Sequence, residues 1–81
     1  TGESKKAIEV LEKTISYRAN YSEAHFALGL FYHDLGADQS GKIIDANYHE
    51  KAIGEMEYIL KNLNPKDEQA KQYLEAWIKE K

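Results

Sequence analysis

The stretch EAHFALGLFYHDLG, from Glu23 to Gly36, decides the fold of this chain because its apolar residues run almost all the way round a helix. A helix with one face in solvent carries its apolar residues on a single stripe. The stretch therefore predicts a helix that is covered on two sides. Gly29 supports this, since a glycine costs about 1 kcal/mol in a helix interior and is explained if another helix crosses close to the backbone there.

The composition limits the class of protein. The chain has 81 residues, of which 42% are hydrophobic and 31% charged, which predicts one small globular domain over residues 1–81. Its 11 basic and 14 acidic residues give a net charge of −3, so a nucleic-acid partner, which needs a cationic footprint, is not expected. Cysteine is absent, which excludes thiolate metal sites. No apolar run approaches the roughly 18 residues of a membrane span, so membrane insertion is not expected.

Apolar periodicity predicts an all-α fold of four helices joined by short loops, with neighbouring helices antiparallel. The helices are expected over residues 4–18, 22–35, 42–63 and 65–80, and residues 36–41 form the longest loop. The face of the third helix is formed by Ile44, Tyr48, Ala52, Met56, Ile59 and Leu63. The inner face of the last helix is formed by Ala70, Tyr73, Leu74, Trp77 and Ile78.

Polar residues, glycine and proline predict where these helices begin and end. Ser4 is a plausible N-cap of the first helix, and Asn20 opens a capping-box pattern before the second. Gly36 supplies a left-handed residue that ends the second helix. Asn64 can cap the last helix, with Pro65 at its first position. The C-terminal KEK is expected to be solvated.

The second helix also carries a repeat signature. His25, Leu28, Gly29 and Tyr32 lie at the spacing of the W-x₂-L-G-x₂-Y signature of tetratricopeptide repeats, with His in place of Trp. The chain thus resembles that family over nearly its whole length, with one complete repeat over residues 21–63. The resemblance implies helical hairpins that form a fragment of a right-handed superhelix.

The flanking helices fit the same resemblance. Residues 4–18 resemble the second helix of a preceding repeat, and residues 65–80 resemble a following first helix or a closing cap. The complete repeat is stretched to about 44 residues, against roughly 34 in the family. The stretching comes from the loop 36–41 and from the overlong helix 42–63. Because two repeats' worth of helices rarely bury a solenoid core alone, more repeats or self-association are expected.

In the tetratricopeptide family, peptides bind the concave surface lined by the first helices of successive repeats. The resemblance implies that this surface is formed here by Glu23, Phe26, Leu30 and His33, with Gln69, Gln72, Ala76 and Lys79 on the last helix. Two alternatives stay open for Phe26 and Leu30: they contact a partner, or they are covered by a helix of this chain, by an absent helix or by a second copy. Trp77 either closes the core over Met56 and Ile59 or caps the groove. The charged clamp with which one branch of the family grips C-terminal carboxylates has no counterpart here.

Catalytic and metal chemistry is not expected. The three histidines, His25, His33 and His49, show no spacing that completes a metal site with an acidic residue. The stretch GADQSGK lacks the strand and the spacing of a phosphate-binding loop, and Ser40 has no recognisable His–acid pair. The sequence therefore predicts a non-enzymatic chain with no cofactor.

The function that follows from the resemblance is protein–protein interaction. The chain is expected to act as a scaffold or adaptor that binds a peptide or partner helix in a helical groove. The alternative is a structural oligomerisation bundle with the helix 42–63 as its seam and no peptide ligand.

Overall fold

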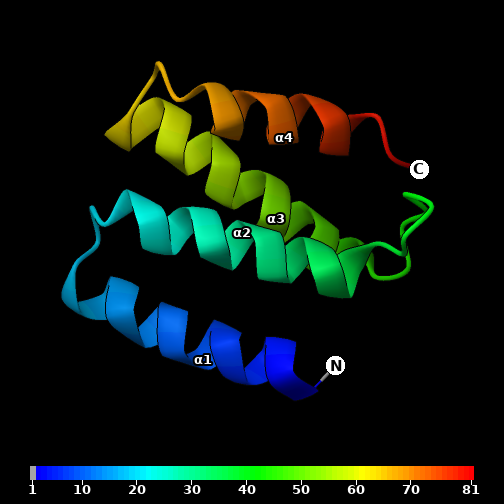
Figure 1. Cartoon of the computed structure of the whole chain (residues 1–81), viewed down its shortest axis with the longest axis horizontal. Helices are drawn as coiled ribbons and strands as arrows, with labels where there is room; N and C mark the ends of the chain where they lie inside the picture. Colours follow the sequence, from blue (N-terminus) through cyan, green and yellow to red (C-terminus); the bar gives the residue numbers. More distant parts are fainter. Residues whose placement is uncertain (1) are drawn as a thin grey trace.

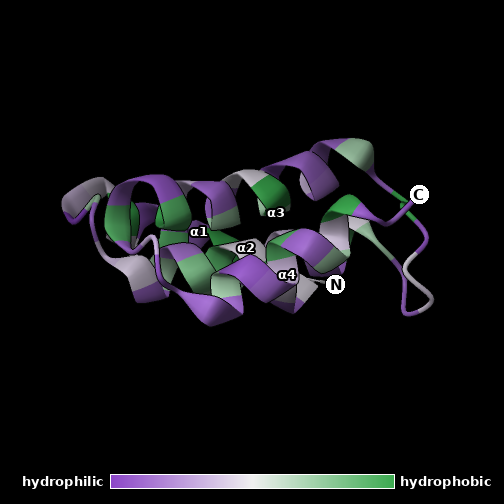
Figure 2. Cartoon of the chain, turned by 90° about the horizontal axis from the view of Figure 1, so that it is seen from above, coloured by the Kyte–Doolittle hydropathy of each residue, from purple (hydrophilic) through white to green (hydrophobic). Residues whose placement is uncertain are grey.

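A computed structural model describes residues 2–81 and confirms that the chain is all-α (Figure 1). Its elements are α1 (Gly2–Tyr17), α2 (Ser22–Gly36), α3 (Ala46–Tyr58), the π-helical turn η1 (Ile59–Leu63) and α4 (Glu68–Ile78). The helices lie side by side in chain order, and each runs antiparallel to the one before it (Figure 1). Each helix carries both hydrophobic and hydrophilic residues (Figure 2).

The start of α1 and the turn before α2 differ from the prediction. The helix already includes Gly2, so Ser4 lies inside it and is not its N-cap. Ser4 is buried instead, and its hydroxyl donates to Asp34 Oδ2 at 2.7 Å, which ties α1 to α2. The capping box at Asn20 was also wrong, because Tyr21 occupies the N-cap of α2 without a side-chain bond. A backbone bond closes that turn, with the Tyr21 N–H donating to Arg18 O at 3.2 Å.

Two glycines let α2 and α3 approach closely. A Cβ on Gly29 would lie 2.8 Å from Met56 Cε and 3.3 Å from Glu55 Cβ, which confirms the close helix crossing predicted there. Gly36 does not adopt the predicted left-handed conformation, since the only positive φ among the described residues is that of Gly41, at 86°. A Cβ on Gly36 would instead lie 2.5 Å from the backbone nitrogen of His49. Gly36 is therefore required by packing.

The third helix begins later than predicted, at Ala46 instead of residue 42. Asp45 is its N-cap and accepts the N–H groups of Asn47 and Tyr48, as a carboxylate does at an exposed helix start. The carbonyl of Gly36 accepts from Ile44 N–H at 2.8 Å and holds this segment against the end of α2. The segment before the cap is therefore loop, and Ile44 is exposed and not part of the helix face.

The connection between α3 and α4 also differs from the expected cap. The N–H of Asn64 donates to Ile59 O at 2.7 Å and closes the π-helical turn. Asn64 Oδ1 then accepts from Lys66 N–H in a turn, and Asp67 caps α4 through Ala70 N–H at 3.0 Å. The helix thus starts at residue 68, because the carboxylate three residues after Asn64 occupies the capping position.

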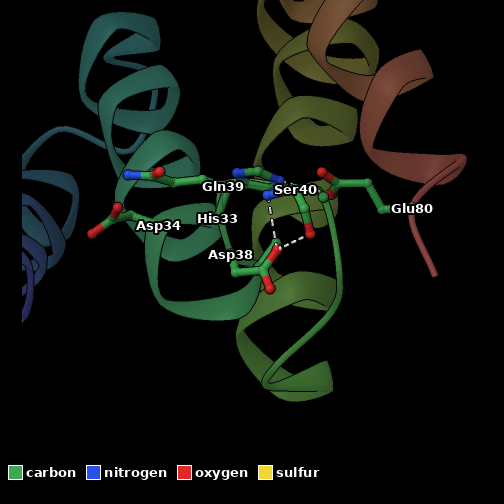
Figure 3. Close-up of a pocket in the computed structure, with 8 residues that line it drawn as sticks. His33, Asp34, Asp38, Gln39, Ser40 and Glu80 are labelled. Carbon is green, nitrogen blue, oxygen red and sulfur yellow. Dashed lines mark hydrogen bonds and ion pairs between the residues drawn. The ribbon is translucent and has the colours of Figure 1, made fainter.

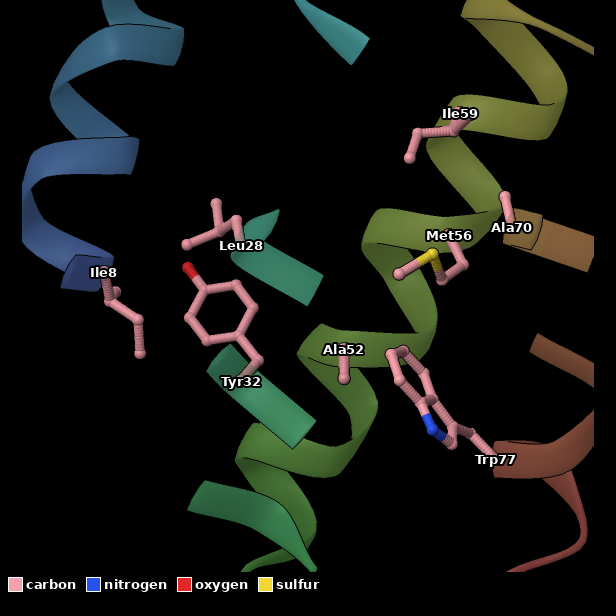
Figure 4. Packing of buried hydrophobic residues seen from close by; sticks show 8 residues of the cluster. All are labelled: Ile8, Leu28, Tyr32, Ala52, Met56, Ile59, Ala70 and Trp77. Atoms are coloured by element: carbon pink, nitrogen blue, oxygen red, sulfur yellow. The ribbon is translucent and has the colours of Figure 1, made fainter. Parts of the chain in front are cut away.

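The core lies between the helices, and all four contribute to it (Figure 4). Its buried members are Ile8, Leu28, Tyr32, Ala52, Met56, Ile59, Ala70 and Trp77. Trp77 belongs to the same cluster as Met56 and Ile59, as the first of its two alternatives predicted. Tyr73 and Ile78 were expected on the inner face of the last helix, but they are 39% and 59% exposed. The inner face of α4 is therefore narrower than its apolar residues suggested.

Candidate interaction surface

α2 presents a second apolar side, away from α3, and this side is only partly covered. Phe26 is half-buried and packs against the core cluster, whereas Leu30, one turn further along, is 36% exposed. Tyr73 of α4 meets Phe26 edge-on, with ring centroids 5.5 Å apart. Part of the second apolar side is thus covered by this chain's own last helix, and part of it is open.

A row of four rings bridges α2 and α4, and we call it the aromatic ladder: Phe26, Tyr73, Trp77 and His33. The rings of Tyr73 and Trp77 are 5.4 Å apart, and the Trp77 ring stacks on His33 at 4.5 Å with an interplanar angle of 9°. Aromatic pairs in such edge-to-face and stacked arrangements stabilise a contact beyond the area they bury. The ladder therefore holds α4 at a defined distance from α2.

Glu80 fixes the far end of the ladder. Its Oε1 accepts from His33 Nε2 at 2.7 Å and from His49 Nε2 at 3.0 Å, so one carboxylate ties α2, α3 and the residues after α4 together. The backbone carbonyl of Lys81 also accepts from Ile43 N–H at 3.2 Å. The prediction of a solvated KEK tail was therefore wrong for Glu80, whereas the side chains of Lys79 and Lys81 are exposed as predicted. The C-terminal residues close the loop end of the molecule.

A small pocket lies at the beginning of α2 and α4, next to Phe26. It is lined by Ser22, Glu23, Phe26, Asp67 and Gln69. Three of the residues predicted at the concave surface, Glu23, Phe26 and Gln69, thus meet in one depression. The carboxylate of Asp67 is partly engaged as the N-cap of α4, and that of Glu23 is exposed.

A second pocket lies at the opposite end of α2 (Figure 3). Its lining consists of His33, Asp34, Ala37, Asp38, Gln39, Ser40, Gly41 and Glu80. The hydroxyl of Ser40 donates to Asp38 Oδ1 at 2.6 Å (Figure 3). That bond, then a bond from the backbone N–H of Lys42 and a smaller effect of the Lys42 charge, lower the pKa of Asp38 below its usual range. The ionised form of the Asp38 carboxyl is therefore favoured at this end of the surface.

The remaining predicted residues are distributed along the two helices. Leu30 lies between the two pockets in the sequence of α2, and His33 is half-buried in the second pocket. Gln72 and Ala76 are exposed on α4, and Lys79 is exposed at its C-cap; none of the three lines either pocket. Sequence reasoning missed Asp67 and Glu80 as parts of this surface. Their positions next to the two ends of the last helix were the available signal.

Another buried histidine, His25, contributes to the packing of α2 against α3. His25 Nδ1 lies 2.7 Å from Glu55 Oε1, its Nε2 lies 2.7 Å from Ala19 O, and its ring stacks on Tyr58 at 4.5 Å. Tyr32 donates to Glu12 at 2.6 Å. Burial and then this hydrogen bond raise the pKa of Tyr32 far above its ordinary value, as expected for a phenol kept neutral.

Within residues 2–81, no group of three or more His, Cys, Asp or Glu side chains is arranged to hold a metal ion. No helix of this part of the chain is both long enough and apolar enough to cross a membrane.

Comparison of the chain with protein-family models, with curated proteins and with solved structures gives no match in any of the three. The class that the structure itself defines is an all-α chain of packed antiparallel helices, with a half-open aromatic surface between α2 and α4.

Proposed function

We propose that this chain is a protein-interaction module that binds a segment of a partner protein on the surface between α2 and α4. The observation that carries the proposal is the half-open apolar side of α2, where Leu30 and Tyr73 are each more than a third exposed beside Phe26. Apolar and aromatic side chains that are grouped in this way, and flanked by depressions, are typical of binding surfaces.

The rigidity of the surface supports the same proposal. The aromatic ladder and the Glu80 bonds fix α4 relative to α2, and the close contact at Gly36 fixes α2 relative to α3. A preformed surface loses little conformational entropy when a partner binds. The module would therefore act by shape and apolar contact, as a scaffold or adaptor does.

A relationship to tetratricopeptide repeats is part of the proposal. In its support, the four signature positions His25, Leu28, Gly29 and Tyr32 are all buried, as packing positions of a helical repeat need to be. Glu23, Phe26 and Leu30 lie on a different side of the same helix, along the surface between α2 and α4. The proposed binding surface thus corresponds to the concave side in that family.

The test is a selection of random peptides by display against the folded chain. Bound clones are then compared on two matched variants, Leu30→Ser and Val10→Ser. Val10 is an exposed apolar residue of α1, 65% accessible, away from the proposed surface. We expect clones that bind the parent and Val10→Ser equally but lose binding to Leu30→Ser. Clones that are insensitive to Leu30→Ser would contradict the proposal.

Self-association is the second candidate, because the same exposed Leu30 and Tyr73 could pair with a second copy. Light scattering across protein concentration distinguishes the two candidates. The module proposal predicts a monomer for the parent and for Leu30→Asp. A parent dimer that becomes a folded monomer in Leu30→Asp would favour the oligomerisation bundle.

A further inference from the structure

The two pockets that flank the aromatic ladder carry the same sign of charge. The pocket at the start of α2 is lined by Glu23 and Asp67, and the pocket at its end by Asp34, Asp38 and Glu80. Neither lining includes a lysine or an arginine. The surface therefore has an apolar middle and two acidic ends.

The carboxylates of Glu23 and Asp38 strengthen the contrast between the apolar middle and the acidic ends of the surface. Glu23 is exposed, and its carboxylate makes no hydrogen bond or ion pair with another side chain among residues 2–81. Asp38 holds its negative charge because hydrogen bonds from Ser40 and Lys42 stabilise the ionised form. A partner group would thus meet the carboxylate of Glu23 at one end and that of Asp38 at the other.

The distance between the ends limits the partner segment. Glu23 and Asp34 are eleven residues apart on α2, which corresponds to about 16 Å along the helix. An extended chain covers that length with about five residues. Two groups that contact both ends are therefore about five positions apart in an extended segment.

We propose that the partner is an extended segment with a lysine or arginine at each end, about five positions apart, and with apolar residues between them. This inference rests on the proposed function. The apolar residues contact Phe26, Leu30 and Tyr73, and the basic ends meet the carboxylates of the two pockets. Complementary charge at the rim selects the partner and speeds encounter, while the apolar middle supplies most of the affinity.

Labelled synthetic peptides test this proposal by fluorescence anisotropy on the full chain. The probe is the peptide KALAFK, with QALAFQ and EALAFE as neutral and acidic counterparts. We expect KALAFK to bind about tenfold more tightly than EALAFE, with QALAFQ between them. The advantage of KALAFK should shrink at high salt, since exposed charges are screened.

Two matched variants locate the effect. Glu23→Gln removes a carboxylate from the first pocket, and Glu9→Gln removes one from the exposed side of α1. Both changes alter the net charge equally and touch no core residue. We expect Glu23→Gln to weaken KALAFK binding about threefold and Glu9→Gln to leave it unchanged.

Several results would overturn the proposal. Equal binding of KALAFK and EALAFE, or no binding of KALAFK at millimolar peptide, excludes the basic segment as partner. Tighter binding of a helical peptide with lysines eleven positions apart excludes the extended form. If all three short peptides bind equally and Leu30→Ser abolishes binding, the charge selection fails while the interaction surface itself stands.

Discussion

Toward α3, the backbone of α2 comes so close that a methyl group on Gly36 would lie 2.5 Å from a backbone nitrogen. Toward α4, the same helix makes contact through rings, with Phe26 and Tyr73 centred 5.5 Å apart and Leu30 36% exposed. The first interface leaves no room for another molecule. The second is bridged by side chains, and Leu30 and Tyr73 remain partly exposed beside it.

This difference explains why apolar residues run almost all the way round α2. One apolar side forms the core with α1 and α3, where Leu28 and Met56 are buried. The other side needs only part of its residues for the contact with α4. The excess apolar surface is what makes α2 a candidate binding helix, since a helix that served the core alone would need one stripe.

The difference between the two sides of α2 is tested most strongly by truncating one side chain on each of them. Met56→Ala removes a fully buried side chain, at 0% exposure, and should lower the free energy of unfolding by about 3 kcal/mol. Leu30→Ala should lower it by less than about 1 kcal/mol, because Leu30 is already partly in solvent. Urea denaturation followed by circular dichroism measures both. Equal losses would show that the two sides of α2 contribute alike to stability.

The close contact with α3 gives the next largest effect. Gly36→Ala should destabilise the chain by about 2 kcal/mol, because the new Cβ meets backbone atoms that cannot move aside easily. Gly54→Ala is the matched control, since nothing lies within 4 Å of its Cβ position. That change should stabilise α3 by up to about 1 kcal/mol. Thermal melts of both variants test the pair, and a stable Gly36→Ala would contradict the packing reason for this glycine.

The carboxylate that closes the ladder has a smaller effect. Glu80→Ala leaves His33 and His49 without their shared acceptor and should cost about 1.5 kcal/mol. The fluorescence of Trp77 should also change, because this ring stacks on His33 and is the only tryptophan of the chain. Lys79→Ala, at an exposed neighbouring position, is the control and should change neither. Unchanged stability and fluorescence in Glu80→Ala would mean that the C-terminal residues do not fix α4 relative to α2.

The smallest effect concerns the loop. The lowered pKa of Asp38 means that its ionised form stabilises the folded chain above the ordinary Asp pKa of about 3.9. That contribution is lost as the pH falls below this value through the folded pKa. Asp38→Asn should therefore be less stable than the parent at pH 7, and the difference should vanish in acid. Paired denaturation curves at several pH values measure it, and a difference that grows in acid would contradict the sign.

The helices were predictable because apolar periodicity is a local property of the chain. Gly29 was predictable for the same reason, since it interrupts a strong helical pattern. The helix ends were not predictable, because several polar residues compete for each capping position. Asp67 caps α4 in place of Asn64, and Asp45 caps the start of α3. Gly36 has the sequence position of a left-handed terminator, but its role comes from His49, a residue on another helix.

The candidate surface was predicted on α2 and, at Gln69, in part on α4. Phe26, Leu30 and Gln69 were implied by the resemblance to tetratricopeptide repeats, whereas the contribution of Tyr73 depends on how α4 is turned against α2. Periodicity does not determine that rotation. The role of Glu80 could not be predicted from local patterns, because its hydrogen-bond partner His33 lies 47 positions away in the sequence.

One measurement tests the central claim that the surface between α2 and α4 binds a partner. A peptide from the display selection is titrated into ¹⁵N-labelled chain while ¹H–¹⁵N NMR spectra are recorded. Binding at this surface predicts saturable shifts confined to amides of residues 22–41 and 67–80, with Val10 unaffected. Shifts centred on α1 or on the outer side of α3 would contradict it.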